Sequence, residues 1–211
     1  MTQLHRKLCN RTTDPMAAPT SGPPALHLVS WNVAGWDATL RYIRTYYKTL
    51  EAYLERHGCH LLALQEVKLT RQKVQADPEA VHAHPFGSSP GWESFWAFHA
   101  SGGAKAAPKR GFNGVTTYAR KGLTLAADAA PLGDPELDGE GRCLLTDHGG
   151  FVLLNVYAHA TGGDGAEYDA KLARKLSFFS ALSNQSTDLR GRVCVAGRTL
   201  AQCFVQRRST G

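Results

Sequence analysis

The sequence has 211 residues, of which 43% are hydrophobic and 20% charged, enough apolar material for one sizeable globular core. No stretch approaches the roughly 20 consecutive apolar residues that span a bilayer, which argues against a membrane protein or a membrane partner. The net charge of +6 does not by itself indicate nucleic-acid binding, because residues 1–24 carry +2, residues 198–211 carry +3, and the remainder only +1.

The first 24 residues leave the destination of the protein open. They are rich in Arg, Thr and Pro, contain a single acidic residue, and lack the apolar core of a secretory signal. Both an organelle transit peptide and a disordered leader fit this composition. The five cysteines are odd in number and form no Cys-x-x-Cys pair, which favours reduced thiols in an intracellular compartment over a disulfide framework or a zinc site.

The first half of the chain alternates strands and a helix. Residues 26–32 alternate and are β-rich, which predicts a strand ending near Asn32. A helix is expected over residues 39–57, followed by Gly58 at the position of a helix C-cap. Its apolar residues recur every three or four positions: Leu40, Ile43, Tyr47, Leu50 and Leu54. Leu61–Gln65 is a continuous apolar run typical of a strand buried on both faces, and residues 78–90 read as a loop.

The second half predicts more short strands and one further helix. Strands are expected at residues 94–99, 114–120, 143–146, 151–157 and 193–196. The helix is expected over residues 168–182, with Leu172, Leu176 and Phe179 on its core side. Strands mixed with crossover helices predict a layered α/β fold, and the supply of 10 Pro and 21 Gly suits its many turns.

Polar residues stand where apolar strands end, and each has two interpretations. Glu66 follows five mostly apolar residues. It is either an exposed strand-end carboxylate that pairs with Lys68, or a ligand of a hard cation such as Mg²⁺. Asn155 and Tyr157 alternate with Val156 and are expected on one face. Tyr157 is either an aromatic at the rim of the core with its hydroxyl in water, or a phenol directed at a phosphate.

Two further clusters carry positive charge. The segment 109–114 combines Lys109 and Arg110 with Phe112, Asn113 and two glycines, which suits close approach to phosphates but also describes a basic turn before a strand. In Glu140-Gly141-Arg142, the guanidinium is able to donate two hydrogen bonds to one phosphate, although a tripeptide alone carries little information.

The order of these pieces is more informative than any one of them. The chain contains, in sequence, Trp31-Asn32-Val33-Ala34-Gly35, Leu64-Gln65-Glu66-Val67-Lys68-Leu69, Gly111-Phe112-Asn113-Gly114-Val115, Asp138-Gly139-Glu140-Gly141-Arg142, Asn155-Val156-Tyr157 and Val193-Cys194-Val195-Ala196-Gly197. This series resembles the exonuclease III / class II apurinic-apyrimidinic endonuclease family within the endonuclease–exonuclease–phosphatase superfamily. The Glu-Gly-Arg and Asn-Val-Tyr blocks resemble its DNA-repair branch more than its lipid and inositol phosphatases.

The resemblance implies a base excision repair enzyme that hydrolyses the phosphodiester 5′ to an abasic site, with trimming of 3′ ends. Its cofactor would be Mg²⁺ (or Mn²⁺), held by Asn32 and Glu66, with Tyr157 as a catalytic residue near the scissile phosphate. DNA contacts are implied for Arg110, Phe112, Asn113, Arg142 and Asn155. The partner would be double-stranded DNA with abasic sites or 3′ ends, bound by a monomer. The compartment would be the nucleus, or the mitochondrion or chloroplast.

The sequence departs from the family pattern in several places. Ala34 stands where some members carry a carboxylate or a second Asn, and His159 lies near the usual Pro. Arg198 and Leu200 replace the Asp-x-Asn that follows the strand at 193–196, and the family's late Asp-His pair does not appear. We therefore expect residues 25–197 to form the N-terminal portion of the domain and residues 198–211 a divergent tail.

Two expectations follow from these departures. The fold would be a partial four-layer α/β/β/α sandwich, with the first sheet and its helices present and the second sheet mostly missing. The alternative function is a catalytically inactive truncated fragment with at most weak binding of DNA or a partner.

Overall fold

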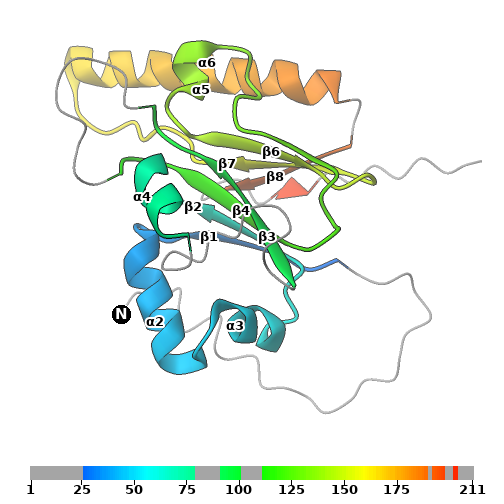
Figure 1. Ribbon diagram of the computed structural model, residues 1–211. Helices are drawn as coiled ribbons and strands as arrows, with labels where there is room; N and C mark the ends of the chain where they lie inside the picture. Colours follow the sequence, from blue (N-terminus) through cyan, green and yellow to red (C-terminus); the bar gives the residue numbers. More distant parts are fainter. Residues whose placement is uncertain (1–25, 79–90, 101–110, 190–191, 198–201, 204–211) are drawn as a thin grey trace, which may run out of the picture.

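Two β-sheets form the centre of the protein in the computed structural model, which describes residues 26–78, 91–100, 111–189, 192–197 and 202–203 (Figure 1). The first sheet contains β1 (Leu28–Asn32), β2 (Leu61–Gln65), β4 (Val115–Arg120) and β3 (Trp92–Ala97), in that spatial order. The second contains β5 (Ala126–Asp128), β6 (Cys143–Asp147), β7 (Val152–Val156), β8 (Val193–Gly197) and β9 (Gln202–Cys203), also in spatial order. Two pairs are parallel, β1 with β2 and β7 with β8, and the other neighbours are antiparallel.

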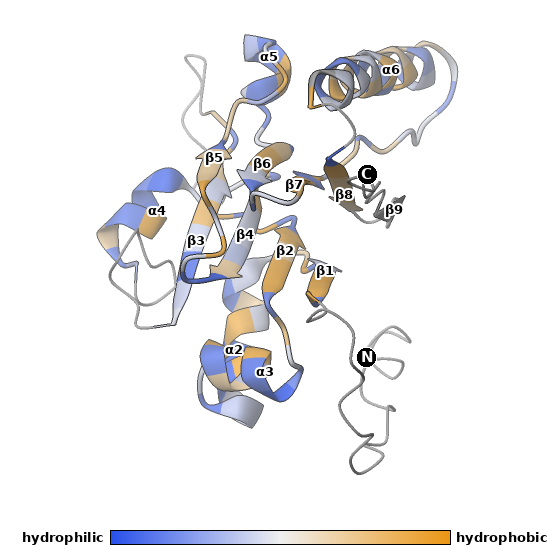
Figure 2. Cartoon of the chain, turned by 90° about the vertical axis from the view of Figure 1, so that its right-hand side faces the viewer, coloured by the Kyte–Doolittle hydropathy of each residue, from blue (hydrophilic) through white to orange (hydrophobic). Residues whose placement is uncertain are grey.

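Helices cover the outer face of each sheet. α2 (Trp36–Tyr47) and α3 (Leu50–Arg56) lie against the first sheet, and α6 (Gly165–Asp188) lies against the second, with the short α5 (Pro135–Asp138) near it (Figures 1 and 2). α4 (Arg71–Ala76) follows β2. The four-layer α/β/β/α sandwich predicted from the sequence is therefore confirmed. Its predicted strands are present as β1, β2, β3, β4, β6, β7 and β8, with ends shifted by at most two residues.

One part of the predicted architecture is wrong, because the second sheet is not mostly missing but has five strands. The strands predicted at residues 143–146 and 151–157 belong to the second sheet as β6 and β7, where β6 pairs with β7 and β7 pairs with β8. A strand pattern reports burial and does not say which sheet the strand joins. β5 escaped prediction because its three residues are all exposed and show no alternation. The predicted leader at 1–24, most of the loop at 78–90 and most of the tail lie outside the described residues.

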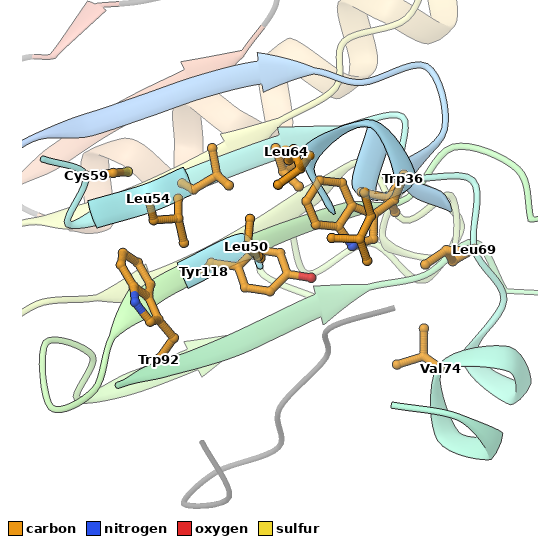
Figure 3. Packing of buried hydrophobic residues seen from close by; sticks show 13 residues of the cluster. Trp36, Leu50, Leu54, Cys59, Leu64, Leu69, Val74, Trp92 and Tyr118 are labelled. Atoms are coloured by element: carbon orange, nitrogen blue, oxygen red, sulfur yellow. The ribbon is translucent and has the colours of Figure 1, made fainter. Parts of the chain in front are cut away.

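The core consists of three apolar clusters. One lies between the first sheet and helices α2 and α3, one between the two sheets, and one between the second sheet and α6. Leu62 and Leu64 of β2 pack with Trp36, Leu50 and other buried residues under α2 and α3 (Figure 3). Leu61 and Ala63, which alternate with them, pack between the two sheets. This division explains why β2 is a continuous apolar run, since both of its faces are buried. A third cluster joins β7 and β8 to Phe178 and Leu182 of α6.

The single helix predicted over residues 39–57 is two helices. The chain turns at Lys48, which has a φ of +67°, and Thr49 then caps α3 by accepting a hydrogen bond from the Ala52 amide at 3.1 Å. The apolar spacing continues across this break because both helices pack on the same sheet. Gly58 follows α3 with a φ of +57°, the left-handed conformation expected after a helix end.

α6 is longer than predicted, and its buried face matches the predicted one only in part. Phe178 and Leu182 are its buried residues, whereas Leu176 is 60% exposed and Phe179 is partly buried. Both sets of residues satisfy helical spacing, so periodicity could not choose between them. Neither α6 nor any other described helix combines the length and the apolarity needed to cross a membrane.

Candidate active site at the ends of β1, β2 and β7

Three of the residues singled out by the sequence meet at one end of the sandwich. Asn32 closes β1 opposite Gln65 of the parallel β2, so Asn32 and Glu66 lie at the same sheet edge. The Asn32 side chain donates a hydrogen bond from Nδ2 to Glu66 Oε1 at 2.8 Å. Tyr157 follows the end of β7 in the other sheet, and its phenol also hydrogen-bonds Glu66. The site is thus built across both sheets.

Glu66 is a largely buried carboxylate that contacts the polar side chains of Asn32, Lys68 and Tyr157. It is 9% exposed, and Lys68 Nζ lies 3.1 Å from its Oε2. Burial alone would raise the pKa of Glu66, but the hydrogen bonds from Asn32, Lys68 and Tyr157 outweigh burial and lower it. The carboxylate is therefore ionised at neutral pH. The pairing with Lys68 considered from the sequence is present, although Glu66 itself is not exposed.

The backbone around this carboxylate is strained. Ala34, Glu66, Lys68 and Asn113 have φ values of +52°, +56°, +53° and +51°, and they are four of the five described non-glycine residues with positive φ. Backbone hydrogen bonds hold the turn: Val67 N–H donates to the Gly114 carbonyl and Lys68 N–H to the Asn113 carbonyl. Residues in sparsely populated backbone conformations cluster at functional sites in proteins, which fits this end of the sandwich.

The glycines of the 111–114 segment serve packing. A Cβ on Gly111 would lie 2.3 Å from the Leu69 backbone, and a Cβ on Gly114 would lie 2.7 Å from the Val67 side chain. Asn113 is 5% exposed and donates from Nδ2 to the Glu140 carbonyl at 3.1 Å. Its predicted DNA contact is thus not supported in this structure, because its amide is buried and engaged within the protein. Phe112 is 58% exposed, and Arg110 lies outside the described residues.

Arg142 lies against Tyr157. Its guanidinium carbon is 4.8 Å from the centroid of the Tyr157 ring, and Nη1 donates to the Tyr157 carbonyl at 3.2 Å. Burial raises the pKa of Tyr157, the hydrogen bond to Glu66 raises it further, and Arg142 opposes both. The phenol is therefore protonated at neutral pH and acts as a hydrogen-bond donor.

The prediction that Asn155 contacts DNA is wrong for this structure. Asn155 is fully buried between the sheets, where its Oδ1 accepts from Gln65 Nε2 at 2.8 Å and its Nδ2 donates to the Thr116 carbonyl at 2.9 Å. Alternation does place Asn155 and Tyr157 on one face, but that face is the interior of the sandwich. Tyr157 reaches the site because it lies beyond the strand end.

Sequence reasoning missed Glu140 and Arg174. Within Glu140-Gly141-Arg142, only Arg142 was assigned a role from the sequence. The acidic side chain two residues before Arg142 could have indicated an ion pair between them. Glu140 binds Arg142 Nε at 2.6 Å and Arg174 Nε at 2.7 Å. Arg174 is one of several basic residues on a helix, and no local pattern distinguishes it from the others.

The donor chemistry at Asn32 and Glu66 fits a small, hard divalent cation. Glu66 supplies an ionised carboxylate, and Asn32 Oδ1 is an amide oxygen that accepts a 3.2 Å hydrogen bond from the Ala34 amide. Within the described residues, no group of three or more His, Cys, Asp or Glu side chains is arranged to hold a metal. Mg²⁺ often needs only one or two protein carboxylates, together with waters and substrate phosphates. The pair therefore suits Mg²⁺ or Mn²⁺ better than a four-ligand zinc site.

Several solved structures share this fold. The Xenopus laevis APE2 catalytic domain aligns with a TM-score of 0.55 and 21% identity, over 81% of this chain and 57% of that one. The AP endonuclease LMAP from Leishmania major aligns with a TM-score of 0.55 and 23% identity, over 81% and 54%. The 3′ phosphatase NExo from Neisseria, bound to a product DNA hairpin, aligns with a TM-score of 0.54 and 18% identity, over 82% and 57%.

The chain spans a little over half the length of these solved structures. At such identities the likeness establishes the fold. Membership rests on a separate comparison, in which the model of the Endonuclease/Exonuclease/phosphatase family matches residues 29–197. That match covers most of the chain, and the protein therefore belongs to the endonuclease/exonuclease/phosphatase family.

Proposed function

We propose that this protein is a divalent-metal-dependent DNA phosphodiesterase of the AP endonuclease type, which cleaves 5′ to abasic sites and also trims 3′ ends. One observation carries the proposal: an ionised, largely buried carboxylate, Glu66, is held by Asn32 and Tyr157 at the edge where two sheets meet. The fold neighbours include an AP endonuclease and a 3′ phosphatase bound to DNA, which supports a DNA substrate.

The residues would divide the work by chemistry. Asn32 and Glu66 would hold Mg²⁺ or Mn²⁺, which neutralises phosphate charge and helps to orient the attacking water when it is bound. The Tyr157 phenol, a protonated donor, would hydrogen-bond a phosphate oxygen as negative charge develops on it. Arg142 would add a fixed positive charge beside that phosphate.

Contacts outside the reacting centre would position the DNA. Phe112 is an exposed aromatic ring next to Asn113 in the sequence and would stack on a sugar or base. Arg110, from the preceding segment, would contribute a backbone phosphate contact. The protein would act as a monomer in the nucleus, or in the mitochondrion or chloroplast if residues 1–24 are a transit peptide.

The test is Mg²⁺-dependent incision of a duplex that carries one abasic-site analogue. Wild-type protein should produce a nick 5′ to the lesion that disappears with a chelator, and Glu66→Ala should abolish it. Glu55→Ala, which removes an exposed carboxylate on α3, is the matched control and should incise like wild type. Equal incision by Glu66→Ala would refute the assignment of Glu66. The absence of incision by folded wild type would refute the activity and leave binding of duplex DNA as the remaining function.

A further inference from the structure

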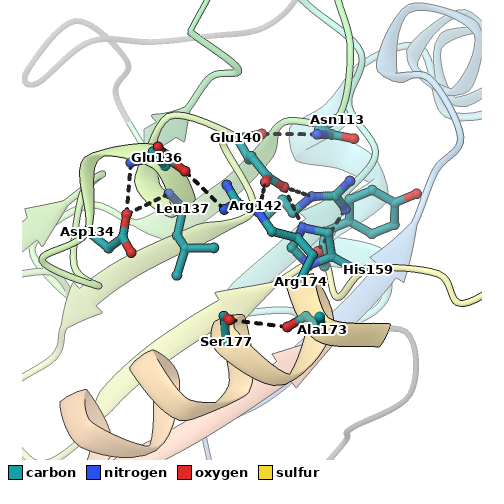
Figure 4. A network of polar contacts seen from close by, with 11 residues as sticks. Asn113, Asp134, Glu136, Leu137, Glu140, Arg142, His159, Ala173, Arg174 and Ser177 are labelled. Atoms are coloured by element: carbon teal, nitrogen blue, oxygen red, sulfur yellow. Dashed lines mark hydrogen bonds and ion pairs between the residues drawn. The ribbon is translucent and has the colours of Figure 1, made fainter. Parts of the chain in front are cut away.

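Glu140 is the centre of an ionic cluster with Arg142, His159 and Arg174 (Figure 4). Its Oε2 accepts from Arg142 Nε at 2.6 Å and contacts His159 Nε2 at 2.5 Å, while its Oε1 accepts from Arg174 Nε at 2.7 Å. Glu140 is ionised because these partners lower its pKa despite the opposing effect of burial. An ionised carboxylate only accepts, so the His159 Nε2 carries the proton. Both carboxylate oxygens are therefore engaged.

The turn that carries Glu140 is held on three sides. The Gly139 carbonyl accepts from the Ala100 amide at 2.7 Å, and the Glu140 carbonyl accepts from Asn113 Nδ2 at 3.1 Å. Gly141 has a φ of +63°, and a Cβ there would lie 2.4 Å from the backbone of Phe98 and His99. The carboxylate of Glu140 is thus presented from a rigid segment, not from a freely moving loop.

This arrangement determines the orientation of Arg142. A guanidinium is planar, so two hydrogen bonds from different nitrogens fix its plane. Nε donates to Glu140, and Nη1 donates to the Tyr157 carbonyl at 3.2 Å. The same guanidinium covers the Tyr157 ring at 4.8 Å, and Tyr157 N–H returns a 2.8 Å hydrogen bond to the Arg142 carbonyl. Tyr157 in turn reaches Glu66.

We propose that Glu140 is a positioning residue that holds Arg142 against Tyr157 and links both to α6 through Arg174. The inference rests on the proposed phosphodiesterase function, because it assigns the placement of that site's two phosphate-facing groups. Among the described interactions, the Glu140 side chain contacts neither Asn32 nor Glu66.

A positioning role and a purely structural role differ in what Glu140→Gln changes. Glutamine keeps the shape but removes the negative charge, so Arg142 and Arg174 lose their shared counterion. Binding of duplex DNA, which depends on net positive charge, should stay the same or tighten. The rate constant for incision, kcat, should fall by about 10- to 100-fold, as is typical when supporting partners around an active site are removed. Loss of structure would weaken both.

The experiment compares Glu140→Gln with Glu136→Gln in the full chain. Glu136 is the matched control, because it pairs with the same Arg174 at 3.3 Å but is 83% exposed and makes no contact with Arg142 among the described interactions. Steady-state incision at saturating substrate gives kcat, and fluorescence anisotropy with the abasic-analogue duplex gives Kd. A fall in kcat with unweakened Kd, seen in Glu140→Gln alone, supports the inference. Wild-type kcat in Glu140→Gln overturns it.

A second readout separates failure of this inference from failure of the proposed function. In an NMR spectrum of ¹⁵N-labelled protein, the Arg142 Nε–H resonance should be sharp and slow to exchange in wild type and in Glu136→Gln. It should be lost in Glu140→Gln. If wild type shows no incision at all, the function fails, and this resonance still decides the inference: an unchanged Arg142 signal in Glu140→Gln overturns it. Should Glu140→Gln not fold, Glu140→Asp keeps the net charge but withdraws the carboxylate from Arg142, and it is scored in the same way.

Discussion

Replacing Asn155 by Ala should destabilise the fold without removing a contact to DNA. Asn155 crosses the interface between the sheets: its Oδ1 accepts from Gln65 Nε2 at 2.8 Å. Its Nδ2 donates to the Thr116 carbonyl at 2.9 Å and the Leu64 carbonyl at 3.2 Å. A side chain in this position acts on the spacing of the sheets, and hence on the distance between Glu66 and Tyr157.

The size of the loss follows from these contacts. Each short hydrogen bond contributes about 1 kcal/mol net, and the two bonds below 3.0 Å set the lower limit. Gln65 Nε2 would keep the Ser30 hydroxyl and the Ala63 carbonyl as acceptors, each at 3.2 Å, so it would not be left without a partner. Adding the longer bond and the small cavity, we expect the free energy of unfolding to fall by about 2–4 kcal/mol.

Urea denaturation followed by tryptophan fluorescence measures this change. Asn184→Ala, an exposed position on α6, is the control and should alter stability by less than about 0.5 kcal/mol. Duplex affinity should be unchanged in Asn155→Ala at temperatures where the variant is folded. A variant that keeps wild-type stability but binds duplex DNA more weakly would refute the reasoning and restore Asn155 as a DNA contact.

Three further outcomes are expected. In urea titrations, Gly141→Ala should lower the free energy of unfolding by about 1–3 kcal/mol more than Gly133→Ala. Both glycines have a left-handed φ, but only at Gly141 would a Cβ clash with neighbouring backbone, and equal losses would contradict this. Burial raises the pKa of Glu140, yet the ion pairs of this carboxylate outweigh burial and hold its pKa below the ordinary 4.5. The ionised Glu140 therefore stabilises the fold above about pH 4.5, and this stabilisation is lost as the pH falls through the lower pKa of the folded state. Glu140→Gln should therefore flatten the acid limb of unfolding free energy against pH, and an unchanged limb would count against the ion pairs. Burial raises the pKa of the Cys59 thiol to about 11. Iodoacetamide should therefore alkylate Cys59 only in denaturant, as measured by peptide mass spectrometry. Rapid labelling of the native protein would disprove the burial of this thiol.

The strands were predictable because apolar patterning reports burial directly. Leu61–Gln65 is continuous in apolar character since α2 and α3 cover one face and the second sheet covers the other. Sheet membership was not predictable, because it depends on pairing between distant strands. The buried face of α6 was predicted only in part, because Leu176 and Phe178 both fit a helical repeat and only the packing on β7 and β8 selects Phe178.

The candidate site shows the same division between local and distant information. Asn32, Glu66 and Tyr157 were singled out because polar residues at the ends of apolar strands are conspicuous, and the structure brings all three together. Asn155 was misassigned because alternation along a strand does not distinguish a strand end from its middle. The contact of Glu140 with Arg174 joins residues that are 34 positions apart, and nothing local marks it.

The left-handed backbone at Glu66 and Lys68 has a consequence for the evolution and engineering of this chain. Non-glycine residues in that conformation cost about 1–2 kcal/mol each, so the turn after β2 is a place where the protein gives up folding stability. Screens that select for thermostability alone would favour Gly or Asn at Lys68, since both adopt this conformation more readily. Such variants would lose the ammonium beside the Glu66 carboxylate. Stability and chemistry are therefore opposed at this turn, and thermostable variants are better sought elsewhere.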